Sequence, residues 1–247
     1  MALYSNEHLL RTDMITGHRG AAALAPENTL AGIKKAVASG IKWIEIDVQL
    51  SADNIPVIIH DRTVQRCTNG QGRVGDLNLG ELKALDAGSW FAAEFAGETI
   101  PTLEEALLAC QKYDLNMNLE IKTYCEEAVK PLVDKVIETV RTMNFPIEKL
   151  LFSSFSAIAL VQCQSLYPDV RRGFITETKS ADMLEELKPL ALYSLHIDHR
   201  ILDEVLATSI KDTGLKLMIW TLNDPTKIDK YTAWGVDNII TDKPNAF

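Results

Sequence analysis

The chain has 247 residues, of which 47% are hydrophobic and 24% are charged, a composition typical of a soluble globular protein. Its formal net charge of −9 argues against a surface that coats nucleic acid or binds anionic membranes. We therefore expect no nucleic-acid partner, although this charge is compatible with a local cationic pocket for a phosphate.

The N-terminal segment, Met1–Met14, is interrupted by polar and charged residues, so we expect no signal peptide. No run in the sequence approaches the roughly 18 apolar residues of a membrane span, so we also expect no membrane anchor. None of the four cysteines forms a C-x-x-C pair, which favours reduced thiols and a cytoplasmic location.

Short segments rich in β-branched residues alternate with helical patterns along the whole chain. The segment Glu126–Met143 has apolar residues at helical spacing, and Thr102 and Glu105 form a capping box that opens another helix. This alternation predicts an α/β fold, a TIM (β/α)8 barrel rather than an open sheet, with one domain over 1–247. The predicted strands are Met14–His18, Trp43–Val48, Met117–Lys122, Leu150–Ser154, Arg171–Ile175, Tyr193–Asp198, Lys216–Thr221 and Asn238–Asp242.

The stretch from Glu45 to Asp61 predicts a hairpin with a tight Asp53-Asn54 turn. The predicted pairing places Glu45 directly opposite His60. Side chains alternate between the faces of a strand, so Glu45 and Asp47 share one face. An isolated E-x-D pattern is more often a polar surface hairpin than a site, so the rest of the chain has to decide.

Segment 62–100 interrupts the regular alternation. It is rich in glycine and contains Trp90, Phe91 and Phe95, which indicates a packed insertion that forms a small cap beside the barrel mouth. Within it, Asn78 and Glu81 predict the capping box of a short helix.

The polar phase of the predicted strands faces the barrel interior, near the strand ends where barrel enzymes carry their sites. Glu45, Asp47 and Glu120 then point into one cavity, where three carboxylates cannot all be ionised without compensation. A bound divalent cation supplies that compensation, and oxygen ligands favour a hard ion such as Mg²⁺ or Ca²⁺. The alternative is a carboxylate–lysine network with Lys122 and Lys216.

Two histidines are expected to reach the same cavity. His18-Arg19-Gly20 ends the first strand, and Gly20 allows the sharp turn that points its neighbours at one ligand. His18 and His60 suit paired general acid and base roles. Arg19 and Lys122 supply hydrogen-bond donors for an anionic oxygen. Together these groups indicate phosphoryl-ester chemistry.

The ordered motifs resemble those of the glycerophosphodiester phosphodiesterases, of the small bacterial cytosolic type within the phospholipase-C-like phosphodiesterases. The resemblance runs from His18 to Pro244. It rests on His18-Arg19-Gly20, Glu27-Asn28-Thr29, Glu45-Ile46-Asp47-Val48, Pro56-Val57-Ile58-Ile59-His60-Asp61, Leu119-Glu120-Ile121-Lys122, Trp220-Thr221 and Thr241-Asp242-Lys243-Pro244.

This resemblance implies a TIM barrel with one divalent cation (Mg²⁺ or Ca²⁺, with Mn²⁺ as a third candidate) and a central insertion at 62–100. It also implies roles for particular residues. The cation ligands are Glu45, Asp47 and Glu120, the acid/base pair is His18 and His60, the phosphate binders are Arg19 and Lys122, and Trp220 lines the glycerol or leaving-group side.

The implied reaction is hydrolysis of glycerophosphodiesters to glycerol 3-phosphate and an alcohol. One alternative is a phosphodiesterase for lysophospholipids, in which the insertion aromatics form an apolar rim. Another is a non-catalytic phosphodiester-binding barrel, which the two histidines argue against. The sequence leaves open the oligomeric state and the roles of His196 and Asp198, which are interior groups, supporting groups or direct substrate contacts.

Overall fold

The computed structural model describes residues 13–247, so almost all of Met1–Met14, where no signal peptide is expected, lies outside the described residues. All eight predicted strands are present, with bounds that shift by at most two residues. The strands are β1 (Ile15–Gly17), β2 (Trp43–Leu50), β3 (Pro56–Ile58), β4 (Asn116–Ile121), β5 (Leu150–Ser154), β6 (Arg171–Thr176), β7 (Ser194–Asp198), β8 (Lys216–Trp220) and β9 (Asn238–Thr241).

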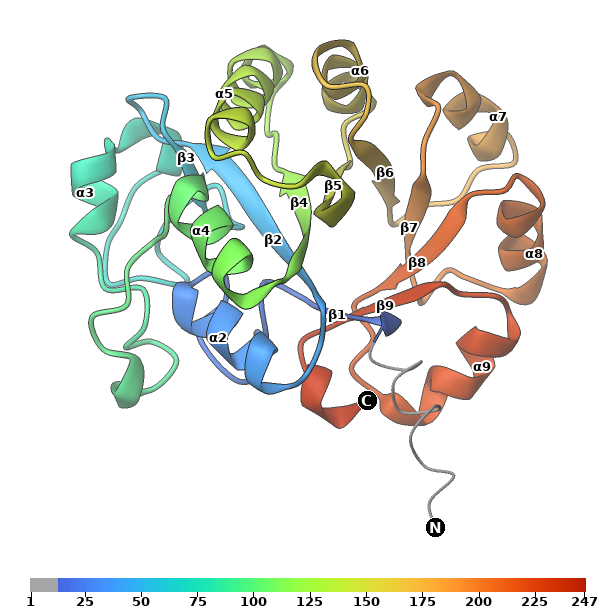
Figure 1. Ribbon diagram of the computed structural model, residues 1–247, viewed down its shortest axis with the longest axis horizontal. Coiled ribbons are helices and arrows are strands. Elements are labelled where there is room, and N and C mark those ends of the chain that lie inside the picture. Colours follow the sequence, from blue (N-terminus) through green and yellow to red (C-terminus); the bar gives the residue numbers. More distant parts are fainter. Residues whose placement is uncertain (1–12) are drawn as a thin grey trace.

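The parallel strands close into a barrel, because β1 pairs with β2 on one side and with β9 on the other (Figure 1). β3 stands outside this ring and pairs antiparallel with the end of β2. The chain therefore has the predicted TIM-barrel fold, with helices between the strands around the outside.

The helices begin and end close to the predicted positions. The predicted capping box opens α4, where Thr102 Oγ1 accepts from the Glu105 amide and Glu105 Oε2 accepts from the Thr102 amide. α2 begins at Leu30, after its N-cap Thr29, because the left-handed φ of 57° at Asn28 is incompatible with a helix. The α-helices are α2 (Leu30–Ala38), α3 (Leu79–Lys83), α4 (Leu103–Tyr113), α5 (Val129–Thr142), α6 (Ala157–Leu166), α7 (Met183–Leu187), α8 (Glu204–Asp212) and α9 (Ile228–Ala233).

Short 3₁₀ turns lead into or out of several of these elements. They are η1 (Val74–Asp76), η2 (Ala93–Phe95), η3 (Glu126–Ala128), η4 (Ile147–Lys149), η5 (Lys188–Leu190), η6 (Pro225–Lys227) and η7 (Pro244–Ala246).

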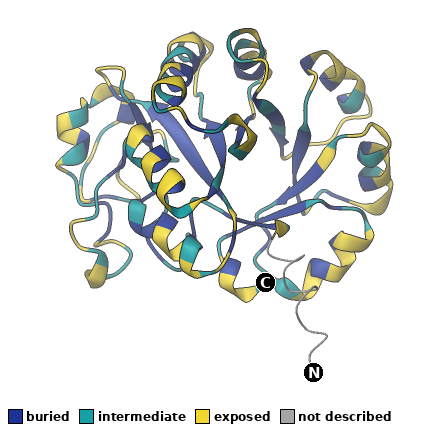
Figure 2. Cartoon of the chain, viewed as in Figure 1, coloured by how far each residue is buried: buried dark blue, intermediate teal, exposed yellow. Residues whose placement is uncertain are grey.

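The main hydrophobic core lies between the strands and the outer helices. Ile44, Ile46 and Val48 of β2 are at most 1% exposed and pack into this layer. Figure 2 shows the strands as largely buried and the outer faces of the helices as exposed. The apolar phase therefore faces outward as predicted, which leaves the polar phase for the interior of the barrel.

The predicted hairpin register is wrong by one residue. Val48 pairs with Ile58, and β3 ends there, so His60 lies beyond the paired strand instead of opposite Glu45. A three-residue loop replaces the tight turn, because Ser51 bonds with Ile55 and Asn54 takes a left-handed φ of 61°.

Segment 62–100 forms a packed region next to β3, at the left of Figure 1. Val64, Val74 and Leu82 belong to a small hydrophobic cluster separate from the main core. The predicted capping box of α3 is present. That 1–247 forms one domain, with 62–100 as a cap within it, stays a prediction.

Two further expectations can be compared with residues 13–247. Within that range, no helix is both long enough and apolar enough to span a bilayer. Cys67, Cys110, Cys125 and Cys163 are unpaired, and Cys110 and Cys163 are buried as small core side chains.

Candidate active site

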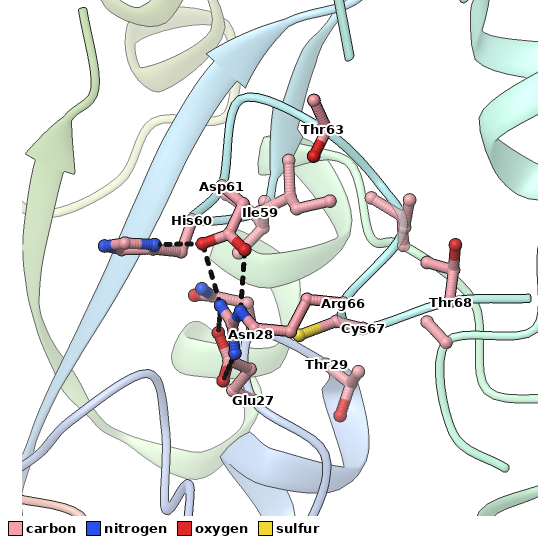
Figure 3. A pocket seen from close by; sticks show the side chains of 13 residues that line it. Glu27, Asn28, Thr29, Ile59, His60, Asp61, Thr63, Arg66, Cys67 and Thr68 are labelled. Carbon is pink, nitrogen blue, oxygen red and sulfur yellow. Dashed lines mark hydrogen bonds and ion pairs between the residues drawn. The ribbon is translucent and has the colours of Figure 1, made fainter. Parts of the chain in front are cut away.

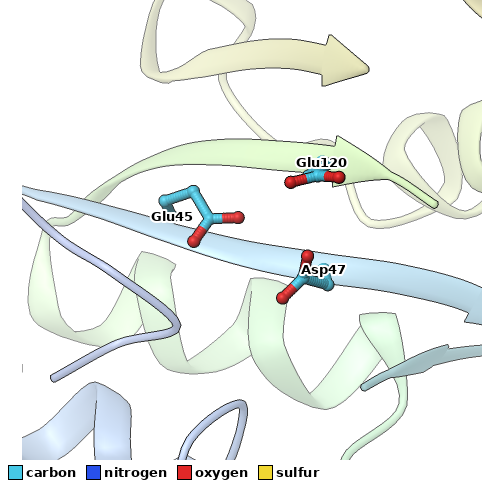
Figure 4. A group of neighbouring side chains, drawn as sticks. All are labelled: Glu45, Asp47 and Glu120. Carbon is cyan, nitrogen blue, oxygen red and sulfur yellow. The ribbon is translucent and has the colours of Figure 1, made fainter. Parts of the chain in front are cut away.

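Three buried carboxylates gather at the carboxyl ends of two neighbouring strands (Figure 4). Glu45 and Asp47 lie on β2, and the parallel register places Glu120 of β4 beside Asp47. One oxygen from each residue lies within 4.8 Å of the other two. The alternation along the strands thus brings together the side chains that the sequence predicted.

Burial and mutual repulsion make this cluster unstable as three free anions. Burial raises the pKa of Glu45, and the charges of Asp47 and Glu120 raise it further. Burial and Asp47 raise the pKa of Glu120 to about 7. Burial also acts upward on the pKa of Asp47, but Lys122 and Arg19 outweigh it, so that pKa is lowered.

One carboxylate oxygen of Glu45 lacks a hydrogen-bond partner. Oε2 accepts from the backbone amide of Arg19 at 3.0 Å, whereas Oε1 is buried without a hydrogen-bond partner. A buried carboxylate oxygen without a partner is costly. All-oxygen donors at this spacing fit a hard divalent cation, which would give that oxygen its partner.

The lysine network exists only in part. Lys122 Nζ lies 2.8 Å from Glu120 Oε1 and 3.7 Å from Asp47 Oδ1. Lys216, by contrast, is exposed at the start of β8 and pairs with Asp237 at 3.0 Å. The expectation that Lys216 joins this network is therefore wrong, because its strand position lies at the opposite end of the barrel.

Each of the two histidines is oriented by a carboxylate. His18 Nδ1 lies 2.6 Å from Asp242, and His60 Nδ1 lies 2.6 Å from Asp61. Hydrogen bonds from Arg66 and His60 hold the pKa of Asp61 far below its usual range. An ionised carboxylate only accepts, so each Nδ1 donates and proton transfer falls to Nε2, which in His18 lies 3.9 Å from Glu45 Oε2. Asp61 and Asp242 both belong to the motifs that carry the family resemblance.

Burial lowers the pKa of His60, and the nearby charges of Arg19 and Lys122 act in the same direction against the opposing effect of Asp47. His60 is therefore neutral near pH 7 and able to accept a proton.

The turn after β1 sets the position of Arg19. Gly20 has a φ of 88°, and a Cβ at this position would lie 2.8 Å from the backbone of Gly32, so the predicted need for glycine is confirmed. Arg19 itself has a left-handed φ of 49°. Its Nη1 donates to Glu27 at 2.7 Å, while its buried Nε lies 3.6 Å from Asp47 Oδ2 without forming a hydrogen bond.

Arg66, which sequence reasoning missed, links both halves of the site (Figure 3). Its guanidinium donates to Glu27 at 2.7 and 2.8 Å and to Asp61 at 2.6 and 2.9 Å. Glu27 holds Arg19, and Asp61 holds His60. No short motif signals such a link, because Arg66 and Glu27 are 39 residues apart in the sequence.

These groups surround a cavity of about 260 Å³ at the barrel mouth. Trp220 lies on its wall, with its ring edge-to-face with Phe155 at 5.7 Å. The sequence did not single out Phe155, which is 42% exposed. The lining residues are His18, Arg19, Glu45, His60, Asn118, Glu120, Lys122, Phe155, Ile175, Glu177, His196, Trp220 and Ile240.

His196 and Asp198, whose roles the sequence left open, have different surroundings in the structure. His196 lines the cavity and is fully buried, and its Nδ1 has no hydrogen-bond partner. Asp198 instead forms an ion pair with Arg200. The aromatic residues of segment 62–100 do not line this cavity. Phe91 instead packs edge-to-face with both Trp90 and Phe95.

The sequence of this chain is similar to those of known phosphodiesterases. The model of the glycerophosphoryl diester phosphodiesterase family matches residues 18–246. A glycerophosphodiester phosphodiesterase of Caldanaerobacter subterraneus subsp. tengcongensis is 36% identical over 232 residues, which cover 94% of each chain. One of Bacillus subtilis is 30% identical, with 98% of this chain and 88% of that protein covered.

Solved structures agree with the fold. A phosphodiesterase of Oleispira antarctica, in complex with the product sn-glycerol-3-phosphate, superposes with a TM-score of 0.90 at 39% identity, covering 94% of both chains. A glycerophosphodiester phosphodiesterase of Thermotoga maritima gives a TM-score of 0.76 at 28% identity, covering 95% of this chain and 96% of that one.

Proposed function

Because the chain belongs to the glycerophosphoryl diester phosphodiesterase family and is a glycerophosphodiester phosphodiesterase, we propose that it hydrolyses glycerophosphodiesters to glycerol 3-phosphate and an alcohol with one divalent cation. The observation that carries the proposal is one cavity bordered by Glu45 and Glu120 of the carboxylate cluster and by His18 and His60. Binding of a phosphodiester alone needs no acid/base pair, which argues against a non-catalytic barrel. The product bound to the Oleispira relative agrees with this reaction.

In this proposal Glu45, Asp47 and Glu120 hold the cation, which is Mg²⁺ or Ca²⁺, with Mn²⁺ as a third candidate. When bound, the cation supplies Lewis acidity for a phosphoryl oxygen. Arg19 and Lys122 bind the other phosphate oxygens, and Trp220 contacts an uncharged part of the substrate.

The attacking group comes from the substrate. The described residues that line the cavity include no serine, threonine or cysteine. The glycerol hydroxyl next to the phosphorylated carbon attacks phosphorus and loses its proton to Nε2 of one histidine. The other histidine gives a proton to the leaving oxygen, so the alcohol departs and a cyclic glycerol phosphate remains. The lowered pKa of His60 suits it to take the first proton.

Water then opens the cyclic phosphate with the two histidines in exchanged roles. Intramolecular attack gains from proximity, which contributes about 7–11 kcal/mol at best.

The test uses a substrate analogue whose neighbouring hydroxyl is replaced by hydrogen. This analogue should bind but turn over far more slowly, and the cyclic phosphate should be hydrolysed to glycerol 3-phosphate. Cleavage of the analogue at the parent rate would show that water attacks directly.

A lysophospholipid substrate is the second candidate. Its original support, the insertion aromatics, is weakened because they pack against one another. Exposed Phe155 beside Trp220 at the cavity supports it instead. A panel of lysolipids and glycerophosphodiesters that share the same alcohol group, with detection of the released alcohol, separates the two. A cytoplasmic location stays a prediction, tested by cell fractionation.

A further inference from the structure

A second cavity adjoins the catalytic one. It has a volume of about 310 Å³, and Lys122 lines both cavities. Its walls come from the β2–β3 loop, the start of segment 62–100 and the loop before α5. Tyr124 ties this wall to the catalytic site, because its hydroxyl donates to the backbone oxygen of His60 at 2.5 Å. We call this second cavity the side groove.

Two arginines of the side groove have no hydrogen-bond or ion-pair partner among the described residues. Arg62 and Arg73 line it, and neither guanidinium forms a hydrogen bond or an ion pair with another described residue. Arg62 instead lies 5.9 Å from the centre of the Tyr124 ring. Every other described arginine donates to a protein oxygen; these are Arg19, Arg66, Arg141, Arg171, Arg172 and Arg200.

The groove is therefore cationic in a chain of net charge −9. Asp76 also lies on its wall and offsets part of this charge. Lys122 is already paired with Glu120, so the excess of positive charge next to the catalytic cavity comes from Arg62 and Arg73. Free guanidiniums in a concave site are suited to bind phosphate or carboxylate.

We propose that the side groove binds a second anionic group, carried by the alcohol half of the substrate. This inference rests on the proposed function and specifies its substrate class. The glycerol half of a glycerophosphodiester carries only hydroxyl groups besides the scissile phosphate. A second anion must therefore come from the alcohol half, which passes Lys122 into the groove while the scissile phosphate stays beside Arg19.

The experiment compares two substrates in one assay. Bis(glycerophospho)glycerol carries a second phosphate, and glycerophosphocholine carries none on its alcohol half. The readout is kcat/KM for bis(glycerophospho)glycerol divided by kcat/KM for glycerophosphocholine. This ratio is measured in wild type and in Arg62→Gln/Arg73→Gln. The double variant removes two exposed charge contacts, so the ratio should fall about two- to thirtyfold. In wild type, added salt should lower kcat/KM more steeply for the bis-phosphodiester.

The matched control removes two other positive charges, at the opposite end of the barrel. Lys112 and Arg141 lie in the last turns of α4 and α5, so Lys112→Gln/Arg141→Gln should leave the ratio unchanged. A charge reversal at both positions, Arg62→Glu/Arg73→Glu, should lower the ratio further than the double glutamine variant does. Thermal melts of all variants check that they fold.

An unchanged ratio in both groove variants, with both substrates hydrolysed, overturns the side groove and leaves the proposed function intact. Failure to hydrolyse either substrate overturns the proposed function instead. In that case calorimetric binding of bis(glycerophospho)glycerol still decides on the groove, because equal affinity for wild type and the double variant contradicts it.

Discussion

His18 and Asp242 lie 224 residues apart in the chain, yet His18 Nδ1 is 2.6 Å from a carboxylate oxygen of Asp242. The parallel pairing of β1 with β9 brings them together at adjacent strand ends. Asn223 Nδ2 donates to the other Asp242 oxygen at 2.6 Å, which fixes the carboxylate in turn. The ring of His18 is therefore held in a single tautomer.

Replacing Asp242 by asparagine should lower kcat about 10–100-fold, the usual effect of removing an orienting partner. The amide can donate to Nδ1, which favours the wrong tautomer of His18. Steady-state kinetics measure the effect, and Asp169→Asn, an exposed position between α6 and β6, is the matched control. Unchanged kcat in Asp242→Asn would show that this hydrogen bond does not orient a reacting histidine.

Glu120→Gln keeps the shape of the side chain but removes one ligand charge from the cluster. Both cation affinity, measured by calorimetry, and activity should fall heavily. Glu138→Gln, on the exposed face of α5, should change neither. Exhaustive chelation should abolish wild-type activity and metal add-back should restore it, so full activity in a chelated sample would falsify the cation site.

Cation binding should release protons near neutral pH. Burial and Asp47 raise the pKa of Glu120 to about 7, so roughly half of this group is protonated at pH 7 in the free protein. The ligand must be ionised to bind a cation, so affinity should rise as pH rises from about 6 to 8. Calorimetry in buffers of different ionisation enthalpy counts the protons. A count of zero at pH 7 would contradict the raised pKa.

His18 and His60 should behave as one catalytic unit. Replacing either by alanine should lower turnover by about 10²–10⁴-fold, the scale of general acid–base catalysis. The double variant should be little worse than the worse single variant, because groups that act together are not additive. If one single variant keeps near-wild-type turnover, that histidine takes no part in the reaction.

Arg66→Gln should lower kcat/KM about 10–100-fold, although Arg66 need not touch the substrate. Loss of its bonds frees both Glu27, which holds Arg19, and Asp61, which holds His60. The uncompensated charge of Asp61 should raise the pKa of His60, so the acid limb of the pH profile should move to higher pH. Asp47, Arg19 and Lys122 also face His60 and stay unchanged.

Arg66→Lys should restore part of the rate, because one ammonium cannot reproduce the two-sided fork. Arg141→Gln is the control, since Arg141 donates only to the backbone oxygen of Leu166. Wild-type kcat/KM with an unmoved acid limb in Arg66→Gln would remove Arg66 from the positioning of the site.

The carboxylate cluster was predictable from the sequence because it depends on local rules. Alternation along β2 puts Glu45 and Asp47 on one face, and the apolar positions between them identify that face as the interior. The same reasoning placed Glu120 and Lys122. The repeated change between strand and helix patterns was enough to predict the barrel and the end of it at which these groups lie.

The register of the hairpin was not predictable in this way. A single left-handed residue, Asn54, lengthens the loop by one residue and shifts every pair beyond it. His60 nevertheless reaches the cavity because it follows β3, where pairing no longer dictates its direction.

Sequence periodicity alone determined the barrel, the inward face of its strands and the three acids on that face, because each follows from local alternation. The tertiary structure decided the pairings of Asp242 with His18, of Arg66 with Glu27 and Asp61, and of Lys216 with Asp237. It also left Arg62 and Arg73 together in one groove. These relationships join segments that meet only when the barrel closes, and long side chains choose partners by distance in space, which no spacing along the chain encodes.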